Sequence, residues 1–286
     1  MEENRNRARE IAWHICKVLL WYFFYQLACT FAFSLLDDAA RLLTGSDIYF
    51  TTNATLAASL FLSALLTVWH LLKFGYMKFS PRLFSEVPAS ALVKSTLLIF
   101  GSMYLFNVVM TWIPLPDLME NTFMELSDEP LGVLSMALIA PVLEEMIFRG
   151  TIQGYLMRRC RNPWTGILVS AVIFGAIHMN PQQVVYATLL GIVFGWIYYR
   201  TRSLMPVILG HVLNNSVAVV SMKIWGTEDI EAITSESTMT MLPLLIIIAA
   251  GIVSLAMKLN SELPAVPQPW REISEDGTES DKANED

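Results

Sequence analysis

The sequence has little charge for its length. Asp, Glu, Lys and Arg make up 16% of its 286 residues, whereas a soluble domain carries roughly 25%. Hydrophobic residues reach 54%, and the mean hydropathy is +0.48. This composition argues against a cytosolic globular protein and against a disordered chain.

The sequence also has few cysteines and lacks the common one-helix zinc motif. The three cysteines (Cys16, Cys29 and Cys160) lie in or beside apolar runs without metal or redox spacing. We therefore expect reduced packing residues rather than a disulfide scaffold. The one-helix zinc motif His-Glu-x-x-His is absent from the sequence.

A basic surface is missing as well. The net charge is −7, and the segment after Lys258 holds eight acids and two bases, a net charge of −6. Nothing therefore indicates nucleic-acid binding. Residues 259–286 are predicted to form an acidic, disordered cytoplasmic tail.

Long apolar runs dominate the rest of the chain. The first, Ile11–Leu36, is too long for a signal-peptide core. A membrane-spanning helix needs about 20 apolar residues. The further runs are Ala54–Phe74, Ala91–Trp112, Leu131–Met157, Trp164–Met179, Gln183–Tyr199, Leu204–Met222 and Met241–Met257. The sequence thus predicts an all-α, polytopic membrane helical bundle of about eight transmembrane helices.

The connecting loops alternate between basic and mainly acidic composition. The basic ones carry Arg5, Arg7 and Arg9, then Lys73, Lys78 and Arg82, then Arg158, Arg159 and Arg161, then Arg200 and Arg202. Basic loops face the cytoplasm, so both termini are predicted to be cytoplasmic. We expect a multi-pass protein of a bacterial plasma membrane. Its predicted parts are residues 1–130, a motif-bearing core at 131–222, a last helix at 223–258, and the tail.

The fourth span contains three ionisable residues, Glu144, Glu145 and Arg149. Charges inside a bilayer are costly, so such residues are functional candidates. Glu145 and Arg149 are four residues apart and are predicted to pair. Glu144 points about 100° away and is predicted to lack a partner, which leaves it for chemistry. A purely structural ion network is the alternative.

Two further spans bring His178, His211 and Asn215. His211 and Asn215 are four residues apart and share a helix face. A carboxylate can take a proton from water, and an imidazole can orient that water or bind a metal. An amide can donate to a developing oxyanion. These residue types together suit peptide hydrolysis, although packing roles for the histidines remain open.

Three motifs in order resemble a known family. Glu-Glu-x-x-x-Arg (144–149), Phe-x-x-x-His (174–178) and His-x-x-x-Asn (211–215) look like those of the CPBP, or Abi, intramembrane proteases. This family covers type II CAAX prenyl endopeptidases, lysostaphin-resistance-like proteins and bacteriocin-immunity or processing proteins. The resemblance implies an intramembrane endopeptidase whose site lies inside a helical bundle.

The resemblance also implies roles. Glu144 would be the general base, and His178 would orient the water. His211 and Asn215 would stabilise the oxyanion. Glu145, Arg149 and Phe174 would support the site.

Zinc remains an alternative. Glu144, His178 and His211 would supply two nitrogens and one oxygen. A metal-free glutamate mechanism fits equally well, so no cofactor is firmly predicted.

The expected partners are the lipid bilayer and a membrane-associated protein or peptide substrate, prenylated in the CAAX case. Two other function classes stay open. Intramembrane Glu, His and Asn also build the proton relays of transporters. A non-catalytic membrane partner or immunity protein would keep the fold without the chemistry.

Overall fold

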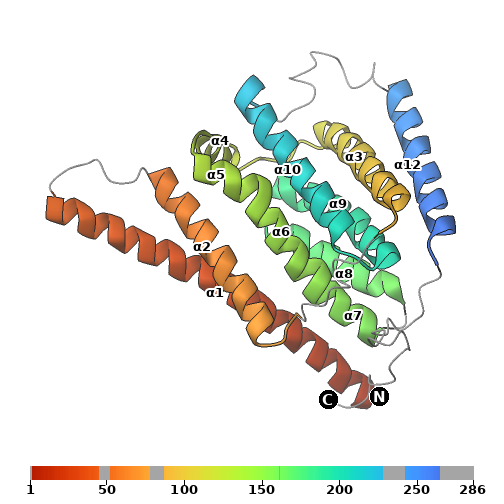
Figure 1. Cartoon of the computed structure of the whole chain (residues 1–286), viewed down its shortest axis with the longest axis horizontal. Helices are drawn as coiled ribbons and strands as arrows, with labels where there is room; N and C mark the ends of the chain where they lie inside the picture. Colours follow the sequence, from red (N-terminus) through yellow and green to blue (C-terminus); the bar gives the residue numbers. More distant parts are fainter. Residues whose placement is uncertain (1, 45–51, 78–86, 161, 228–241, 265–286) are drawn as a thin grey trace. The chain divides into compact units, whose positions relative to one another are not determined.

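The computed structural model describes residues 2–44, 52–77, 87–160, 162–227 and 242–264. Within these ranges the regular elements are all helices (Figure 1). The predicted all-α, polytopic membrane bundle is therefore confirmed. The predicted disordered tail lies, from residue 265 onward, outside the described residues.

In the part of the chain that the structure describes, seven helices are long and apolar enough to cross a membrane. They are Arg5–Leu43, Ala54–Lys73, Ala89–Thr111, Pro130–Arg159, Pro181–Thr201, Met205–Trp225 and Leu242–Glu262. The predicted fifth span is the exception, because α8 (Pro163–Ala176) has only 14 residues. At a rise of 1.5 Å per residue it is about 21 Å long, shorter than a hydrocarbon core of about 30 Å. The cytoplasmic placement of the termini stays a prediction.

The described residues fall into two compact units. Unit 1 comprises the described parts of 1–79, 118–146 and 211–234. In it, α1 (Glu2–Thr44) packs along α2 (Thr52–Lys73), as Figure 1 shows. The helix α2 also contacts α5 (Pro130–Leu134), the π-helix η2 (Ser135–Ile139) and α6 (Ala140–Glu145). The carboxyl-terminal part of α10 (Met205–Trp225), from His211, belongs to this unit.

Unit 2 comprises the described parts of 80–117, 147–210 and 235–286. It contains α3 (Ala89–Thr111), most of the π-helix η3 (Met146–Gln153), α7 (Gly154–Arg159), α8, α9 (Pro181–Thr201) and α12 (Leu242–Glu262). The helices α8 and α9 pack on each other, and α3 packs on both α9 and α12. These contacts bury the aromatic side chains Phe148, Phe174 and Phe194.

Three boundaries differ from the predictions. The helix α1 is longer at both ends than Ile11–Leu36, and an Arg41–Asp37 ion pair of 2.9 Å, four residues apart, stabilises its last turns. A short helix, α4 (Glu120–Asp128), lies in a predicted acidic loop. The last helix continues through Glu262, into the predicted tail, where Arg200 donates to the carbonyls of Asn260 and Leu263 at 2.9 Å.

Candidate active site

A proline and a π-helical turn leave one carbonyl of the fourth span without a backbone donor. In η2 the N–H of Ala140 bonds to the carbonyl of Ser135, five residues back. The Met136 carbonyl therefore loses its α-helical donor, and its π-helical donor would be residue 141. That residue is Pro141, which has no N–H. Buried carbonyls are normally paired, so this geometry calls for a donor from outside the helix.

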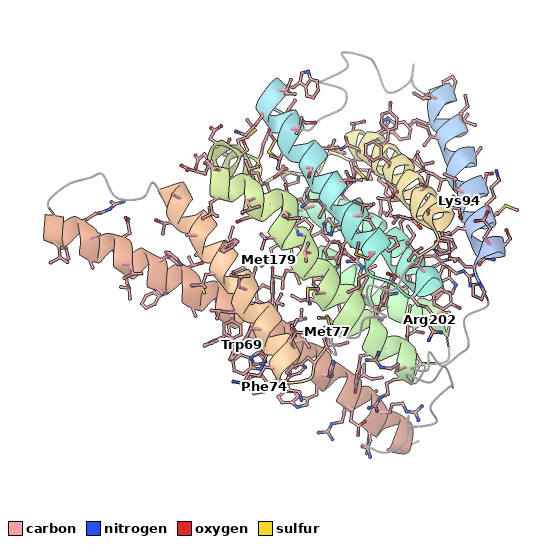
Figure 2. The ribbon with its side chains drawn as sticks, viewed as in Figure 1. Trp69, Phe74, Met77, Lys94, Met179 and Arg202 are labelled. Carbon is pink, nitrogen blue, oxygen red and sulfur yellow. The ribbon has the colours of Figure 1, made fainter. Side chains whose placement is uncertain are left out.

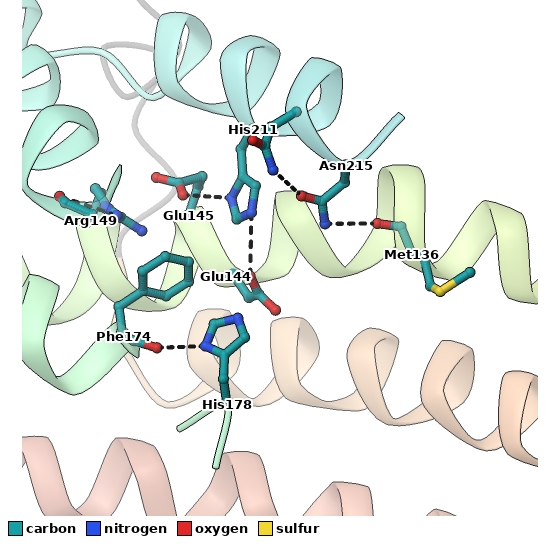
Figure 3. Close-up of polar contacts among 10 residues, drawn as sticks. Met136, Glu144, Glu145, Arg149, Phe174, His178, His211 and Asn215 are labelled. Carbon is teal, nitrogen blue, oxygen red and sulfur yellow. Dashed lines mark hydrogen bonds and ion pairs between the residues drawn. The ribbon is translucent and has the colours of Figure 1, made fainter. Parts of the chain in front are cut away.

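Asn215 of α10 supplies that donor. Its Nδ2 donates to the Met136 carbonyl at 3.1 Å, and its Oδ1 accepts from Asn214 Nδ2 at 2.9 Å (Figure 3). Both ends of the Asn215 amide are thus bonded, which fixes its orientation. Asn214 was not among the predicted site residues.

One imidazole in unit 1 faces both glutamates. Nδ1 of His211 lies 2.8 Å from Oε1 of Glu145, and Nε2 lies 3.6 Å from Oε2 of Glu144 (Figure 3). The first contact is a hydrogen bond, in which Nδ1–H donates to the carboxylate. The second is too long for a hydrogen bond but lies within ion-pair range. Glu144 is therefore not isolated, and the prediction that it lacks a partner was wrong, because a residue 67 positions later completes the contact.

The two glutamates differ in their access to the surroundings. The Glu145 side chain is 0% exposed and that of Glu144 is 14% exposed. The imidazole is thus held from one side by a fully buried carboxylate and directs its other nitrogen at a reachable one. A base oriented by a third group is the arrangement that hydrolytic sites use.

Arg149 lies in unit 2 and is fully buried. Its guanidinium carbon is 4.5 Å from the Phe174 ring centroid and 5.2 Å from that of Phe194. Its Nη2 donates to the Gly191 carbonyl at 3.3 Å. Cation–π contacts of this kind stabilise a desolvated guanidinium. The Glu145–Arg149 pair would join the two units, so it stays a prediction.

Gln153, one helical turn after Arg149, also donates to a glycine carbonyl of α9. The sequence analysis did not identify this residue. Its Nε2 donates to the Gly195 carbonyl at 2.7 Å, and its side chain is fully buried. A Cβ at position 195 would lie 2.8 Å from Gln153 Oε1, and one at position 191 would lie 3.2 Å from Ala171. The glycines therefore permit close packing within unit 2. The spacing of Arg149, Gln153, Gly191 and Gly195, four residues apart on each helix, is the signal that could have identified Gln153.

His178 follows α8 in the tight connection to α9 and is half-buried. Its Nδ1 lies 2.8 Å from the Phe174 carbonyl, so Nδ1–H donates to that carbonyl, and Nε2 is the nitrogen left for another partner (Figure 3). The Phe174 ring stands edge-on to the imidazole at 5.1 Å. Asn180, two residues later, donates to Asp117 at 2.9 Å and ties down the same connection.

The predicted residues are thus distributed over both units. Unit 1 brings together Glu144, Glu145, His211 and Asn215, and unit 2 brings together Arg149, Phe174 and His178. Among the described residues, no group of three or more His, Cys, Asp or Glu side chains is placed to hold a metal ion. The zinc set takes ligands from both units and stays a prediction.

Two comparisons with known proteins found a match. Residues 127–217 match the family model described as type II CAAX prenyl endopeptidase Rce1-like. Over 91 residues the chain is 33% identical to the protein named "Putative membrane peptidase YdiL" of Bacillus subtilis (strain 168). That alignment covers 32% of this chain and 37% of the relative. No solved structure matches the chain.

The matched segment contains all three motifs. It begins four residues before the predicted core and ends two residues after Asn215. The seven long apolar helices agree with an integral multi-pass membrane protein. The resemblance predicted from the motifs is thereby confirmed: residues 127–217 are similar to the type II CAAX prenyl endopeptidases of the CPBP family.

Proposed function

We propose that the chain is an intramembrane endopeptidase that hydrolyses a peptide bond with water activated by Glu144. One observation carries this proposal: the same imidazole contacts two glutamates, of which one is fully buried and the other is partly exposed. A purely structural network has no need for the exposed member. An intramembrane carboxylate within reach of water is a candidate general base.

Unit 1 holds two further groups for this chemistry. His211 has Nδ1–H fixed on Glu145, and its Nε2 can carry a proton toward Glu144 or a substrate oxygen. One Nδ2 proton of Asn215 is directed at Met136, which leaves the second for a developing oxyanion. Such a donor is useful when it is already oriented before the reaction, and the two bonds to Asn215 supply that orientation.

The resemblance to the family implies a further role for His178 of unit 2, which would orient the attacking water. With Nδ1–H bonded to Phe174, the neutral ring has an accepting Nε2 that suits the positioning of a water molecule. In the zinc alternative, Glu144, His178 and His211 would hold the ion, which would polarise the water. Loss of stoichiometric zinc together with activity on chelation would favour that alternative over the metal-free mechanism.

The substrate class follows from the setting of the site. An endopeptidase in a membrane bundle acts on a membrane-associated protein or peptide. The matching family model is named for CAAX prenyl endopeptidases, and a CAAX motif is a C-terminal sequence whose cysteine is prenylated. We propose either such a lipidated C-terminus or a peptide of the bacteriocin-processing kind as the substrate.

The test compares protein termini in host membranes that contain equal amounts of wild type or the Glu144→Gln variant. New termini that require Glu144 would support the protease and identify its substrate. The matched control is Glu125→Gln, the same change at an exposed acid of α4 in unit 1. The control should yield the wild-type termini.

Identical termini from folded wild type and Glu144→Gln would contradict the proposal. Glu144-dependent ion flux in liposomes would then favour a transporter. Equal biological rescue by both proteins would favour a non-catalytic partner.

A further inference from the structure

An aromatic cavity at the carboxyl end of α2 lies outside the candidate active site. It has a volume of about 270 Å³ and belongs to unit 1. Its lining residues are Trp21, Tyr25, Trp69, His70, Phe74 and Tyr76. Figure 2 labels Trp69 and Phe74 at this end of α2. None of these residues has a part in the proposed hydrolysis.

A glycine turn builds one wall of this cavity. The helix α2 ends at Lys73, and Gly75 takes a left-handed φ of 71°. The N–H of Met77 then bonds back to the Leu71 carbonyl at 3.1 Å. Glycine adopts this conformation without a steric penalty, and such turns commonly end helices. The turn brings the Tyr76 ring to 5.8 Å from that of His70.

The cavity has a fixed polar centre. His70 is buried, with its Nδ1 3.0 Å from the Tyr25 hydroxyl. Its ring lies 4.3 Å from that of Trp21 and 4.4 Å from that of Phe74. In contrast, Trp69 is 48% exposed and Phe74 is 58% exposed. The cavity therefore has a buried, hydrogen-bonded floor and an exposed aromatic rim.

Two lysines lie over aromatic rings that line the cavity, Lys17 over Tyr76 and Lys73 over Trp69 and Phe74. Nζ of Lys73 is 4.6 Å from the Trp69 ring centroid, and Nζ of Lys17 is 5.8 Å and 5.9 Å from those of Trp13 and Tyr76. Neither lysine has an ion-pair partner among the residues that the structure describes. Two ammonium groups at one aromatic opening disfavour a cationic ligand and favour an anionic one.

We propose that this cavity binds the headgroup of an anionic phospholipid. The phosphate would lie between Lys17 and Lys73, and the glycerol and first acyl carbons would cover the exposed faces of Trp69 and Phe74. Tryptophan and tyrosine favour the headgroup level of a bilayer, and basic pockets between membrane helices bind anionic headgroups. The site depends on charge and aromatic surface only, so it stands independently of the proposed protease.

The experiment measures retained lipid on the full chain. Purified protein in nanodiscs of phosphatidylcholine with one tenth phosphatidylglycerol is released into the gas phase, and native mass spectrometry counts the bound lipids. Wild type should retain phosphatidylglycerol, and a Lys17→Gln/Lys73→Gln variant should bind it about tenfold to thirtyfold more weakly. A Lys17→Arg/Lys73→Arg variant should retain the lipid, which separates loss of charge from loss of fold.

The matched control removes two charges from the same helix. Arg5 and Arg9 are eight or more residues from Lys17, at least about 12 Å along α1. The Arg5→Gln/Arg9→Gln variant should keep the lipid. Equal losses in the two double variants would indicate diffuse surface attraction and would overturn the site. Retention by Lys17→Gln/Lys73→Gln would overturn it as well.

Two probes identify the ligand source. Glycerol 1-phosphate at millimolar concentration should not displace the lipid, because it lacks the acyl carbons that cover the tryptophan. Complete displacement would reassign the cavity to free phosphate esters. Retention of phosphatidylcholine as strong as that of phosphatidylglycerol would contradict the role of the two lysines.

Discussion

The polar groups buried in unit 1 and unit 2 are held in different ways. In unit 1, His211 faces two carboxylates, of which one remains partly exposed. In unit 2, Arg149 and Gln153 are bonded to helix carbonyls at glycine positions and are fully buried. In the first arrangement a proton can pass between the imidazole and a carboxylate, whereas in the second each side chain donates to a helix carbonyl that cannot take up a proton. Under the proposed function, unit 1 would carry the chemistry, and this part of unit 2 would carry stability.

The largest effect is expected for His211→Ala, which should lower both the cleavage rate and the stability of the protein. Cleavage should fall at least about a hundredfold. The protein should lose about 3 kcal/mol, because the buried Glu145 loses its 2.8 Å partner. Cleavage rate and melting temperature of the purified protein test this, with His14→Gln as the control. An unchanged melting temperature would contradict the contact with Glu145.

Arg149→Ala should act on stability. The substitution removes a fully buried side chain together with its two cation–π contacts and its hydrogen bond to the Gly191 carbonyl, at a cost of about 3–5 kcal/mol. Turnover per folded molecule should fall less than in His211→Ala. Arg159→Ala, which removes the same charge near the end of α7, should melt close to wild type. A catalytic loss in Arg149→Ala as large as that in His211→Ala would remove the distinction between the units.

Gly195→Ala tests the close packing in unit 2. The added Cβ would lie 2.8 Å from Gln153 Oε1, and such overpacking costs about 1–3 kcal/mol. Combining it with Gln153→Ala should be less than additive, because the clash disappears. Gly251→Ala on α12 is the control, since nothing lies within 4 Å of its Cβ. Strict additivity of the first pair in thermal unfolding would refute the contact.

The smallest effect is expected for Asn214→Ala. Without its 2.9 Å bond the Asn215 amide is held at one end only, so kcat should fall roughly tenfold with KM and melting temperature unchanged. Ser216→Ala, the neighbouring position in α10, should leave kcat unchanged. A shift confined to KM would mean that Asn214 acts on substrate binding instead.

Much of this fold follows from the sequence because hydropathy reports burial in lipid directly. Each of the eight predicted spans corresponds to a helix, although the fifth is too short to count among the seven long ones. The helix α4 was missed because its acidic composition resembles that of a loop.

The residues of the site could be predicted from the sequence, but the contacts between them could not. The motifs identified Glu144, Glu145, His211 and Asn215, yet spacing along one helix could not reveal that α10 faces both glutamates. The Met136 carbonyl was invisible to sequence reasoning, since it depends on a π-helical turn before Pro141. Local periodicity describes a regular helix, whereas π-helical turns and contacts between helices depend on tertiary packing.

The central claim is that Glu144 activates water while Glu145 only holds His211. The direct measurement is the turnover of purified Glu144→Gln on a peptide that spans the bond identified by the comparison of termini, together with its melting temperature. We predict a loss of at least about a hundredfold at an unchanged melting temperature. Turnover within a few-fold of wild type, in a protein that melts normally, would contradict this account.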